Sequence, residues 1–198
     1  MNIFLASGSE RRIALLKQIG IEPVAKSMDI DETVFNDEKP LDYVLRMAEK
    51  KAEAGRKYCH KDNKLRNYNV IGADTSVITC SGEILGKPHN LSDAEQMLKK
   101  LSGNSHKVIT SVAVITADKE LFSDYAETEV TMKTLNDAEI SKYTASGEPF
   151  GKAGAYAIQG IAAKYISNIN GSYSGVMGLP LFQLSELLQS VKESAEKI

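Results

Sequence analysis

Apolar and polar residues follow each other in patterns that predict strands and helices in turn along the chain. Short apolar runs bounded by small or polar residues indicate strands, and apolar residues recurring every three to four positions indicate helices. Strands are expected at residues 2–7, 70–74, 77–79, 83–85, 107–116, 121–135 and 161–168. Helices are expected at 9–19, 40–58, 92–103, from 136 onward, and at 180–196, with a polar loop at 60–69.

Several element ends carry local signals of their own. Pro40 suits the first turn of a helix, because its missing N–H would have no partner there. Ser92-Asp93-Ala94-Glu95 has the spacing of a capping box, and Asn136 with Glu139 predicts another helix start. Ser81-Gly82 lies between two short strand patterns and predicts a hairpin turn.

The order of these elements predicts an α/β fold with a mixed sheet. Helices and strands alternate, but the two long strand patterns on either side of 117–119 suggest antiparallel neighbours. The 198 residues suffice for one domain with its own core, and 42% of them are hydrophobic. We therefore expect a single domain over 1–198, with an elongated sheet in two lobes around a cleft.

Charge and composition narrow the classes of partner. The formal net charge of -2 gives no broad basic surface for nucleic acid, so an anionic ligand would need a local cluster of Lys and Arg. The apolar run at 3–6 is too short for a signal peptide, and no apolar stretch is long enough to span a membrane. We expect a cytoplasmic protein with no membrane partner, in which Cys59 and Cys80 are free thiols rather than zinc ligands.

The first candidate site is the turn before the first helix, Ser7 to Arg12. Backbone N–H groups at a helix N-terminus bind phosphate, and arginine adds bidentate donors. Ser9, Arg11 and Arg12 lie at this turn. The alternative is that Ser9 only caps the helix and that the arginines are solvated.

A second candidate is Asp74, followed by Thr75, at the expected end of an apolar strand. The carboxyl ends of strands gather ligand sites in α/β sheets, and a carboxylate there can hold a metal or accept a proton from water. The alternative is that Asp74 caps the next turn. Lys87 follows Gly86, but the spacing is not that of a phosphate-binding P-loop, so Lys87 is either a point charge for phosphate or a solvated turn lysine.

Two further segments carry side chains that could bind a base, a metal or a phosphate. Residues 152–160 contain small residues followed by Gln159, whose amide can pair with the edge of a base, although a tight packing corner would have the same composition. Asp31 and Glu32 precede a helix that carries Lys50 and Lys51. Carboxylates of this kind can bind a metal, and the lysines can bind phosphate. Taken alone, such charges are usually solvated surface residues.

Taken together, these segments resemble the Maf family of nucleotide pyrophosphatases. The strings that match, in order and spacing, are LASGSERR, GADT, LGKP, LSGNSHKV, KAGAYAIQG and NGSYSGVMGLPL. The last two strings look like the dTTP/UTP branch of the family, whereas the 7-methyl-GTP branch typically has Trp in place of Arg11 and Glu in place of Gln159. The resemblance implies an inosine-triphosphatase-like fold, a divalent metal such as Mg or Mn, and a homodimer.

The resemblance also implies roles for individual residues. Asp74 matches the family's proton acceptor, and Glu32 is implied as a metal ligand together with Asp74. The matching specificity positions are Arg11, Thr75 and Gln159. The matching polar residues of the phosphate site are Ser9, Arg12, Lys51 and Lys87. Two positions depart from the family pattern, with Glu10 in place of a frequent Pro and Gly151 in place of a frequent Asp.

The resulting expectation is an enzyme that hydrolyses dTTP and UTP to the monophosphate and pyrophosphate. Water would attack the α-phosphorus with help from Asp74 and the metal. One alternative is a pyrophosphatase for modified or purine triphosphates. Another is a nucleotide-sensing protein linked to septum formation, although a sensor would not need Asp74 as a base.

Overall fold

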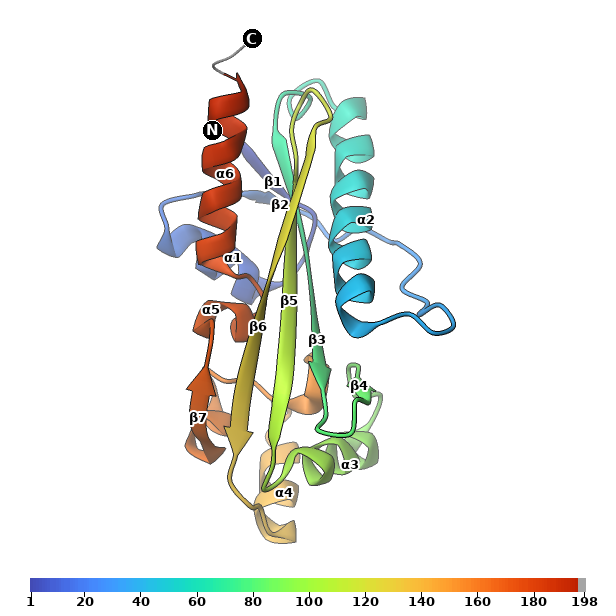
Figure 1. The fold of residues 1–198 in the computed structure, drawn as a ribbon, viewed down its shortest axis with the longest axis vertical. Helices are drawn as coiled ribbons and strands as arrows, with labels where there is room; N and C mark the ends of the chain where they lie inside the picture. The colour runs from blue at the N-terminus through green and yellow to red at the C-terminus, as the bar shows by residue number, and fades with distance from the viewer. Residues whose placement is uncertain (196–198) are drawn as a thin grey trace. The chain divides into compact units, whose positions relative to one another are not determined.

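The computed structural model describes residues 1–195 of the chain. Two compact units are distinguished: unit 1 comprises Met1–Asp74, Thr110–Ala126 and the described chain from Gly178, and unit 2 comprises Thr75–Ile109 and Glu127–Met177. Three of the four unit boundaries fall inside the long strands labelled β3, β5 and β6 in Figure 1, and the fourth follows Met177, between two helices. A single domain over 1–198 stays a prediction, and residues 196–198 lie outside the described chain.

A mixed sheet is the central element of the fold, as the sequence predicts. Its strands are β1 (Ile3–Leu5), β2 (Val24–Ala25), β3 (Asn69–Ile78), β4 (Ile84–Leu85), β5 (Ser105–Ile115), β6 (Leu121–Met132) and β7 (Ile166–Asn170). Their order is β2-β1-β3-β5-β6-β7, with β4 paired to β3. β1 pairs in parallel with β2 and β3, whereas the β3–β4 and β6–β7 pairs are antiparallel.

Unit 1 carries the helices α1 (Glu10–Gln18), α2 (Pro40–Lys61) and α6 (Leu181–Ala195). The long helix α2 packs closely on β1 and β3 because small residues line the contact. A Cβ at Gly55 would lie 2.7 Å from Val70 Cγ1, and a Cβ at Gly72 would overlap the backbone of Ala48 and Ala52. This approach fixes α2 along the strand that carries Asp74.

Unit 2 carries α3 (Leu91–Leu101), α4 (Asp137–Thr144), α5 (Tyr173–Met177) and two short 3₁₀ helices, η1 (Ala153–Ala155) and η2 (Ile161–Tyr165). Its core joins the buried faces of α3 and α4 to side chains of β3, β5 and β6. The expected helix start at Asn136 is confirmed, and Asn136 forms a capping box with Glu139 through reciprocal hydrogen bonds. The hairpin at Ser81-Gly82 is confirmed by the pairing of Val77 with Leu85.

Three sequence predictions need correction. The strand expected to end at Asp74 continues to Ile78, so Asp74 lies within a strand and caps no turn. The capping box expected at Ser92 to Glu95 is wrong: the helix starts at Leu91, and its N-cap is Asn90, whose side chain accepts a hydrogen bond from Asp93 N (2.9 Å). The short strand β2 was not predicted.

The third correction concerns residues 161–168, which were expected to form a strand. Residues 161–165 are helical instead, and only Ile166 onward belongs to β7. The Glu148 carboxylate accepts hydrogen bonds from the first two backbone N–H groups of η2, those of Ile161 (2.8 Å) and Ala162 (3.2 Å). A distant side chain thus satisfies the donors of a helix start, which local patterning does not reveal.

Other expectations of the sequence can be checked directly. Cys59 and Cys80 are both free, the first buried and the second exposed. None of the helices in the described part of the chain has the length and apolar character needed to span a membrane. The last residue of the predicted helix at 180–196 lies outside the described residues, and α6 agrees with the rest.

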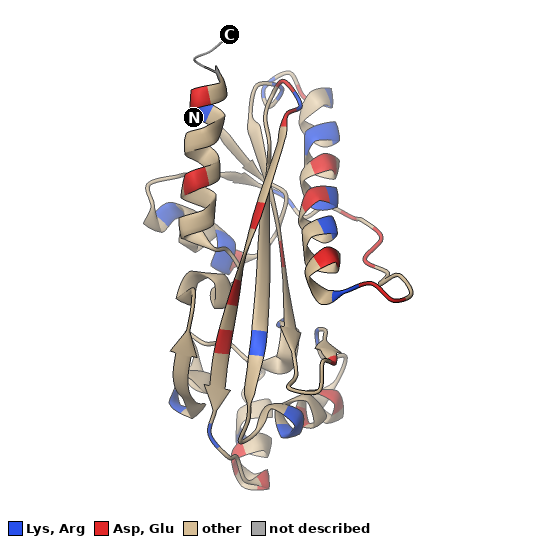
Figure 2. Ribbon diagram, viewed as in Figure 1, with Lys and Arg blue, Asp and Glu red and all other residues tan. Residues whose placement is uncertain are grey.

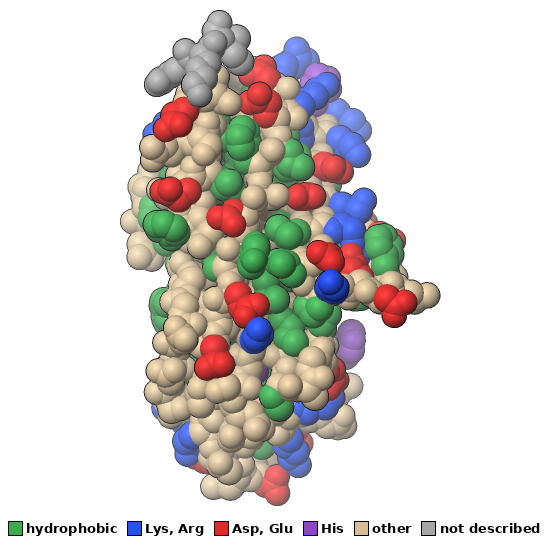
Figure 3. Space-filling view, viewed as in Figure 1, with side chains coloured by type: hydrophobic (Ala, Val, Ile, Leu, Met, Phe, Trp, Pro, Cys, Tyr) green, Lys and Arg blue, Asp and Glu red, His purple; other side chains and the backbone are tan. Residues whose placement is uncertain are grey.

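Charged side chains of both signs are interspersed over the molecule. Figure 2 shows acidic residues in the loop that leads into α2, and both acidic and basic residues along α2 itself. On the face drawn in Figure 3, basic side chains gather over the C-terminal end of α2, and elsewhere the two signs are mixed. This distribution agrees with the small net charge.

Candidate active site

Asp74 lies on β3 in unit 1, where the packing of α2 determines its neighbours. Gly72 and Asp74 are two residues apart in a strand, so they face the same side of the sheet. Gly72 lies under Ala48 and Ala52 of α2, and Lys51 belongs to the same turn of that helix. The Lys51 side chain therefore extends over Asp74, and both side chains are largely buried, with 12% and 14% of their surface exposed.

Lys51 makes two short ion pairs with carboxylates from different segments. Its Nζ lies 2.7 Å from Asp74 Oδ1 and 2.7 Å from Glu32 Oε1. The Glu32 side chain is 47% exposed, so solvent reaches this side of the cluster. The expectation that Glu32 and Lys51 are merely solvated surface charges is wrong, because both take part in a partly buried network with Asp74.

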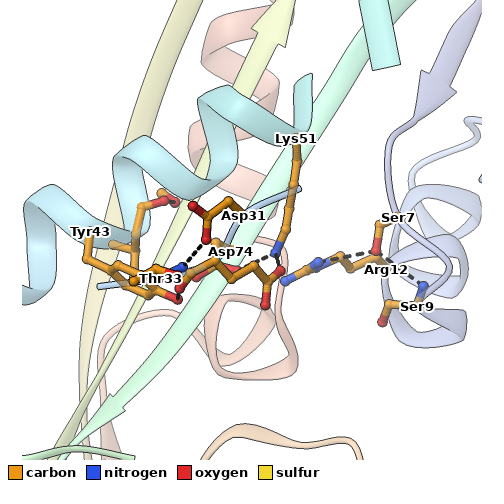
Figure 4. Close-up of polar contacts among 11 residues, drawn as sticks. Ser7, Ser9, Arg12, Asp31, Thr33, Tyr43, Lys51 and Asp74 are labelled. Carbon is orange, nitrogen blue, oxygen red and sulfur yellow. Dashed lines mark hydrogen bonds and ion pairs between the residues drawn. The ribbon is translucent and has the colours of Figure 1, made fainter. Parts of the chain in front are cut away.

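Arg12 approaches the same cluster from α1. Its Nε donates to the Gly178 carbonyl (2.7 Å), and its Nη1 donates to Ser7 Oγ (3.2 Å). Burial lowers the pKa of Arg12, and the nearby carboxylates of Asp74 and Glu32 oppose that shift. Figure 4 shows Arg12, Lys51 and Asp74 converging from three different elements.

The N-terminus of α1 has no capping hydrogen bond from its N-cap side chain. Ser9 is the N-cap residue, but its side chain makes no capping hydrogen bond, and its N–H donates to Ser7 Oγ (3.2 Å). The alternative in which Ser9 caps the helix through its hydroxyl is therefore wrong. Arg11 follows on the same helix and is half-buried, which lowers the pKa of its guanidinium.

Sequence reasoning did not identify three residues that surround Glu32. Tyr43 donates to the Glu32 carbonyl (3.1 Å), and burial, with the charges of Asp74 and Glu32, raises the pKa of Tyr43 to about 12. Arg46 and Glu38 form an ion pair through two hydrogen bonds. Tyr43, Arg46 and Lys50 recur at three- to four-residue spacing on α2, which is the signal that could have singled out a polar helix face.

Unit 2 contains the remaining predicted residues. Thr75 follows Asp74 on β3 and is half-buried, whereas Lys87 is exposed and has no ion-pair partner in the described chain. Gln159 is exposed in the turn at 157–160. The small residues before it are explained by packing, since Gly154 has a φ of +68° and a Cβ there would lie 2.9 Å from Val77 Cγ1.

The turn that carries Gln159 is held by its neighbours. Tyr143 Oη accepts from Ala157 N (3.3 Å) and donates to Glu148 Oε1 (2.8 Å). Glu148 also binds the backbone N–H groups of Ile161 and Ala162, on the other side of Gln159. The turn is thus tied at both ends by one Tyr–Glu pair, and the Gln159 side chain projects to solvent.

Comparison with known proteins identifies the family. The family model described as Maf-like protein matches residues 2–191. The chain belongs to the Maf family. The resemblance noted from the sequence strings is confirmed.

Curated Maf relatives match over nearly the whole chain. The dTTP/UTP pyrophosphatase of Pseudoalteromonas translucida is 46% identical over 188 residues, which cover 95% of this chain and 96% of that protein. The dTTP/UTP pyrophosphatase of Nitrosomonas europaea is 47% identical over 195 residues, covering 94% and 93%. The nucleoside triphosphate pyrophosphatase of Haemophilus ducreyi is 43% identical over 189 residues, covering 96% and 94%.

Solved structures show a weaker and partial likeness. The Staphylococcus aureus Ham1 protein is 15% identical, with a TM-score of 0.43, and the match covers 67% of this chain and 72% of that one.

Proposed function

We propose that this protein hydrolyses dTTP and UTP to the nucleoside monophosphate and pyrophosphate. The observation that carries the proposal is the contact of one ammonium group, that of Lys51, with both Asp74 and Glu32. Cation and carboxylates in one partly buried network are what a phosphoryl-transfer site needs. The names of the full-length relatives support the same reaction.

In the proposed reaction Asp74 is the general base. A water oxygen attacks the α-phosphorus, and its proton passes to the Asp74 carboxylate. The bond from the α-phosphorus to the oxygen that bridges to the β-phosphorus breaks, and that oxygen leaves with pyrophosphate. A carboxylate placed for this step typically contributes a hundredfold or more to the rate.

The cationic residues of unit 1 are proposed to bind the triphosphate. Arg12 offers a fork of donors that suits phosphate oxygens, and its position beside the N-terminus of α1 adds backbone N–H groups. Lys51 would turn from the carboxylates to a phosphate oxygen when substrate enters. The Ser9 hydroxyl, which makes no capping hydrogen bond, is proposed to donate to the phosphate. Lys87 is proposed to add a point charge.

The residues of the cluster fit a divalent cation that is shared with the substrate. In residues 1–195 no group of three or more His, Cys, Asp or Glu could hold a metal ion by itself. Magnesium is usually bound by one or two carboxylates together with phosphate oxygens. Asp74 and Glu32 both contact the Lys51 ammonium group in this structure. These two carboxylates would be the ligands for Mg or Mn, and the metal would offset phosphate charge.

Base choice is assigned to residues outside this cluster. We propose that Gln159, Arg11 and Thr75 select the base, with Gln159 pairing its amide to the carbonyl and N–H groups of thymine or uracil. The proposal includes a homodimer and a cytoplasmic location, with no nucleic acid or membrane as partner.

A pyrophosphate-release assay tests the proposal. Purified protein should release pyrophosphate from dTTP and UTP faster than from CTP or 7-methyl-GTP, and excess EDTA should stop turnover without unfolding the protein. Binding of dTTP without any pyrophosphate release would instead support the nucleotide-sensing alternative. Preference for a purine or a modified triphosphate would overturn the substrate assignment but leave the family unchanged.

A further inference from the structure

Glu32 lies in a segment that has no helix or strand to fix it. Residues 31–38, here called the acid loop, connect to α2 through a turn in which Asp37 has a φ of +60°. Thr33 N donates to Asp31 Oδ1 (2.9 Å), which orders only the immediate neighbourhood of Glu32. Because a loop loses conformational entropy when it is ordered, other contacts must hold its carboxylate beside Lys51.

Arg46 on α2 makes several contacts with the acid loop. Its Nε and Nη2 donate to the two carboxylate oxygens of Glu38, each at 2.6 Å, and Nη2 also donates to the Thr33 carbonyl (3.0 Å). The guanidinium stacks 3.9 Å from the ring centroid of Phe35. One side chain thus contacts three residues of the acid loop.

Neighbouring groups extend this attachment to the backbone. Phe35 N donates to Glu38 Oε2 (3.1 Å), and Tyr43 Oη donates to the carbonyl of Glu32 itself (3.1 Å). Figure 4 shows Asp31 and Thr33 lying between Tyr43 and Lys51. The acid loop is therefore bound to α2, the same helix that carries Lys51.

The Arg46–Glu38 pair differs from an ordinary surface ion pair. The side chains of Arg46 and Glu38 are 18% and 8% exposed, whereas those of Lys17 and Glu22, which also form a salt bridge, are 52% and 76% exposed. Exposed pairs contribute little, while a shielded bidentate pair that stacks on an aromatic ring orders its surroundings. Lysine could not replace this arrangement, because it lacks the planar fork.

We propose that Arg46 is a positioning residue for Glu32. It holds the acid loop on α2 so that the Glu32 carboxylate stays in register with Lys51 and Asp74. The inference rests on the proposed function only in giving Glu32 a metal to bind. Supporting residues of this kind typically change metal affinity or activity by about 10- to 100-fold when they are removed.

Hydrogen exchange tests the structural half of the inference without any substrate. The test compares the wild type with R46M in peptides that cover residues 29–39. The matched control is R56M: Arg56 lies on the same helix and donates to two carbonyls of another segment, those of Tyr68 and Arg66, each at 2.6 Å. R46M should speed exchange in the acid loop by about tenfold or more, and R56M should not. Unchanged exchange in R46M would overturn the proposal.

Manganese binding tests the functional half. Electron paramagnetic resonance of free Mn²⁺ gives the affinity of the nucleotide-free protein, and the Mn²⁺ concentration for half-maximal pyrophosphate release gives the affinity during turnover. R46M should weaken one or both by about tenfold, R46K should lie between R46M and the wild type, and R56M should match the wild type.

A double variant decides whether Arg46 acts through Glu32. If it does, R46M adds no further loss of Mn²⁺ affinity in an E32Q background. An additive loss, or faster exchange with unchanged Mn²⁺ response, would refute the positioning role. If the wild type releases no pyrophosphate, the proposed function fails, while exchange and Mn²⁺ binding still decide the role of Arg46.

Discussion

The charge cluster of unit 1 and the Gln159 turn of unit 2 are built by opposite means. In the cluster, Lys51, Asp74 and Glu32 come from three segments, and the Lys51 ammonium group contacts both carboxylates. In the turn, the backbone is fixed by Tyr143 and Glu148, and the side chain of Gln159 is left exposed. The first arrangement makes each charge depend on its neighbours, whereas the second lets one side chain change without disturbing its support.

This difference has a consequence for the proposed reaction. Substitutions in the cluster should affect every substrate alike, because phosphate carries no information about the base. Substitutions at Gln159 should alter the choice between substrates at little cost to the reaction itself.

The largest effect is expected for Asp74→Asn. The amide keeps the size of the side chain but removes its charge and its capacity to accept a proton, so kcat should fall about a hundredfold or more. The loss should be similar for dTTP and UTP, and circular dichroism should show an intact fold. Near wild-type kcat would remove Asp74 from the role of base.

The second prediction concerns acid stability and the core of unit 2. His106 is buried, its Nε2 bonds Tyr156 Oη (2.9 Å), and burial lowers its pKa to about 4. Unfolded His106 binds a proton near pH 6.5 and the native form does not, so the free energy of unfolding falls as pH drops from about 6.5 to about 4. The full loss is on the order of 3 kcal/mol.

Urea unfolding of the wild type and H106Q between pH 7 and pH 4 measures this loss. The variant lacks the titrating ring, so its stability should fall less steeply over this range. Parallel curves for the two proteins would show that acid acts elsewhere, for instance on the carboxylates of unit 1.

Gln159→Glu should change the base preference. An ionised glutamate only accepts hydrogen bonds, so a carbonyl of thymine or uracil would face it unpaired, at a cost on the order of a few kcal/mol. The ratio of kcat/KM for dTTP to that for 7-methyl-GTP should fall at least about tenfold. If Gln159 instead only stabilises its own turn, all activities and the Tm would fall together.

Lys51→Met should separate metal binding from turnover. Removal of the ammonium leaves Asp74 and Glu32 without their shared cation, so Mn²⁺ should bind the nucleotide-free variant about tenfold more tightly, on the energy scale of one charge pair. Turnover should nevertheless fall for all substrates, because the phosphate contact is lost. Weaker Mn²⁺ binding in K51M would contradict the view that lysine and metal share these two carboxylates.

The smallest effect is expected for Glu148→Gln. Glutamine has one acceptor oxygen where glutamate has two, so one of the Ile161 and Ala162 N–H groups would face an NH2 donor instead. The loss of this hydrogen bond loosens the turn at 157–162. The dTTP preference should weaken by less than about tenfold, with kcat for dTTP nearly unchanged. A large fall in kcat with unchanged preference would mean that the turn serves the reaction rather than the choice of base.

Much of the fold was predictable from the sequence because its signals are local. The helix start at Asn136, the turn at Gly82 and the apolar spacing of α2 and α6 each depend on residues close together in the chain. The ordered strings that resemble the Maf family predicted the family, which the comparisons confirmed. Periodicity also predicted the mixed sheet, since long antiparallel neighbours and alternating helices leave different patterns.

Only the tertiary structure decided which charges meet. Nothing in the sequence reveals that Gly72 lets α2 approach β3 so that Lys51 lies over Asp74, or that Arg46 binds the loop that carries Glu32. The same holds for residues 161–165, where Glu148 satisfies the first N–H groups and turns an expected strand into a helix. Local patterns report the preferences of neighbouring residues, whereas these contacts join residues 8 to 24 positions apart that only packing brings together.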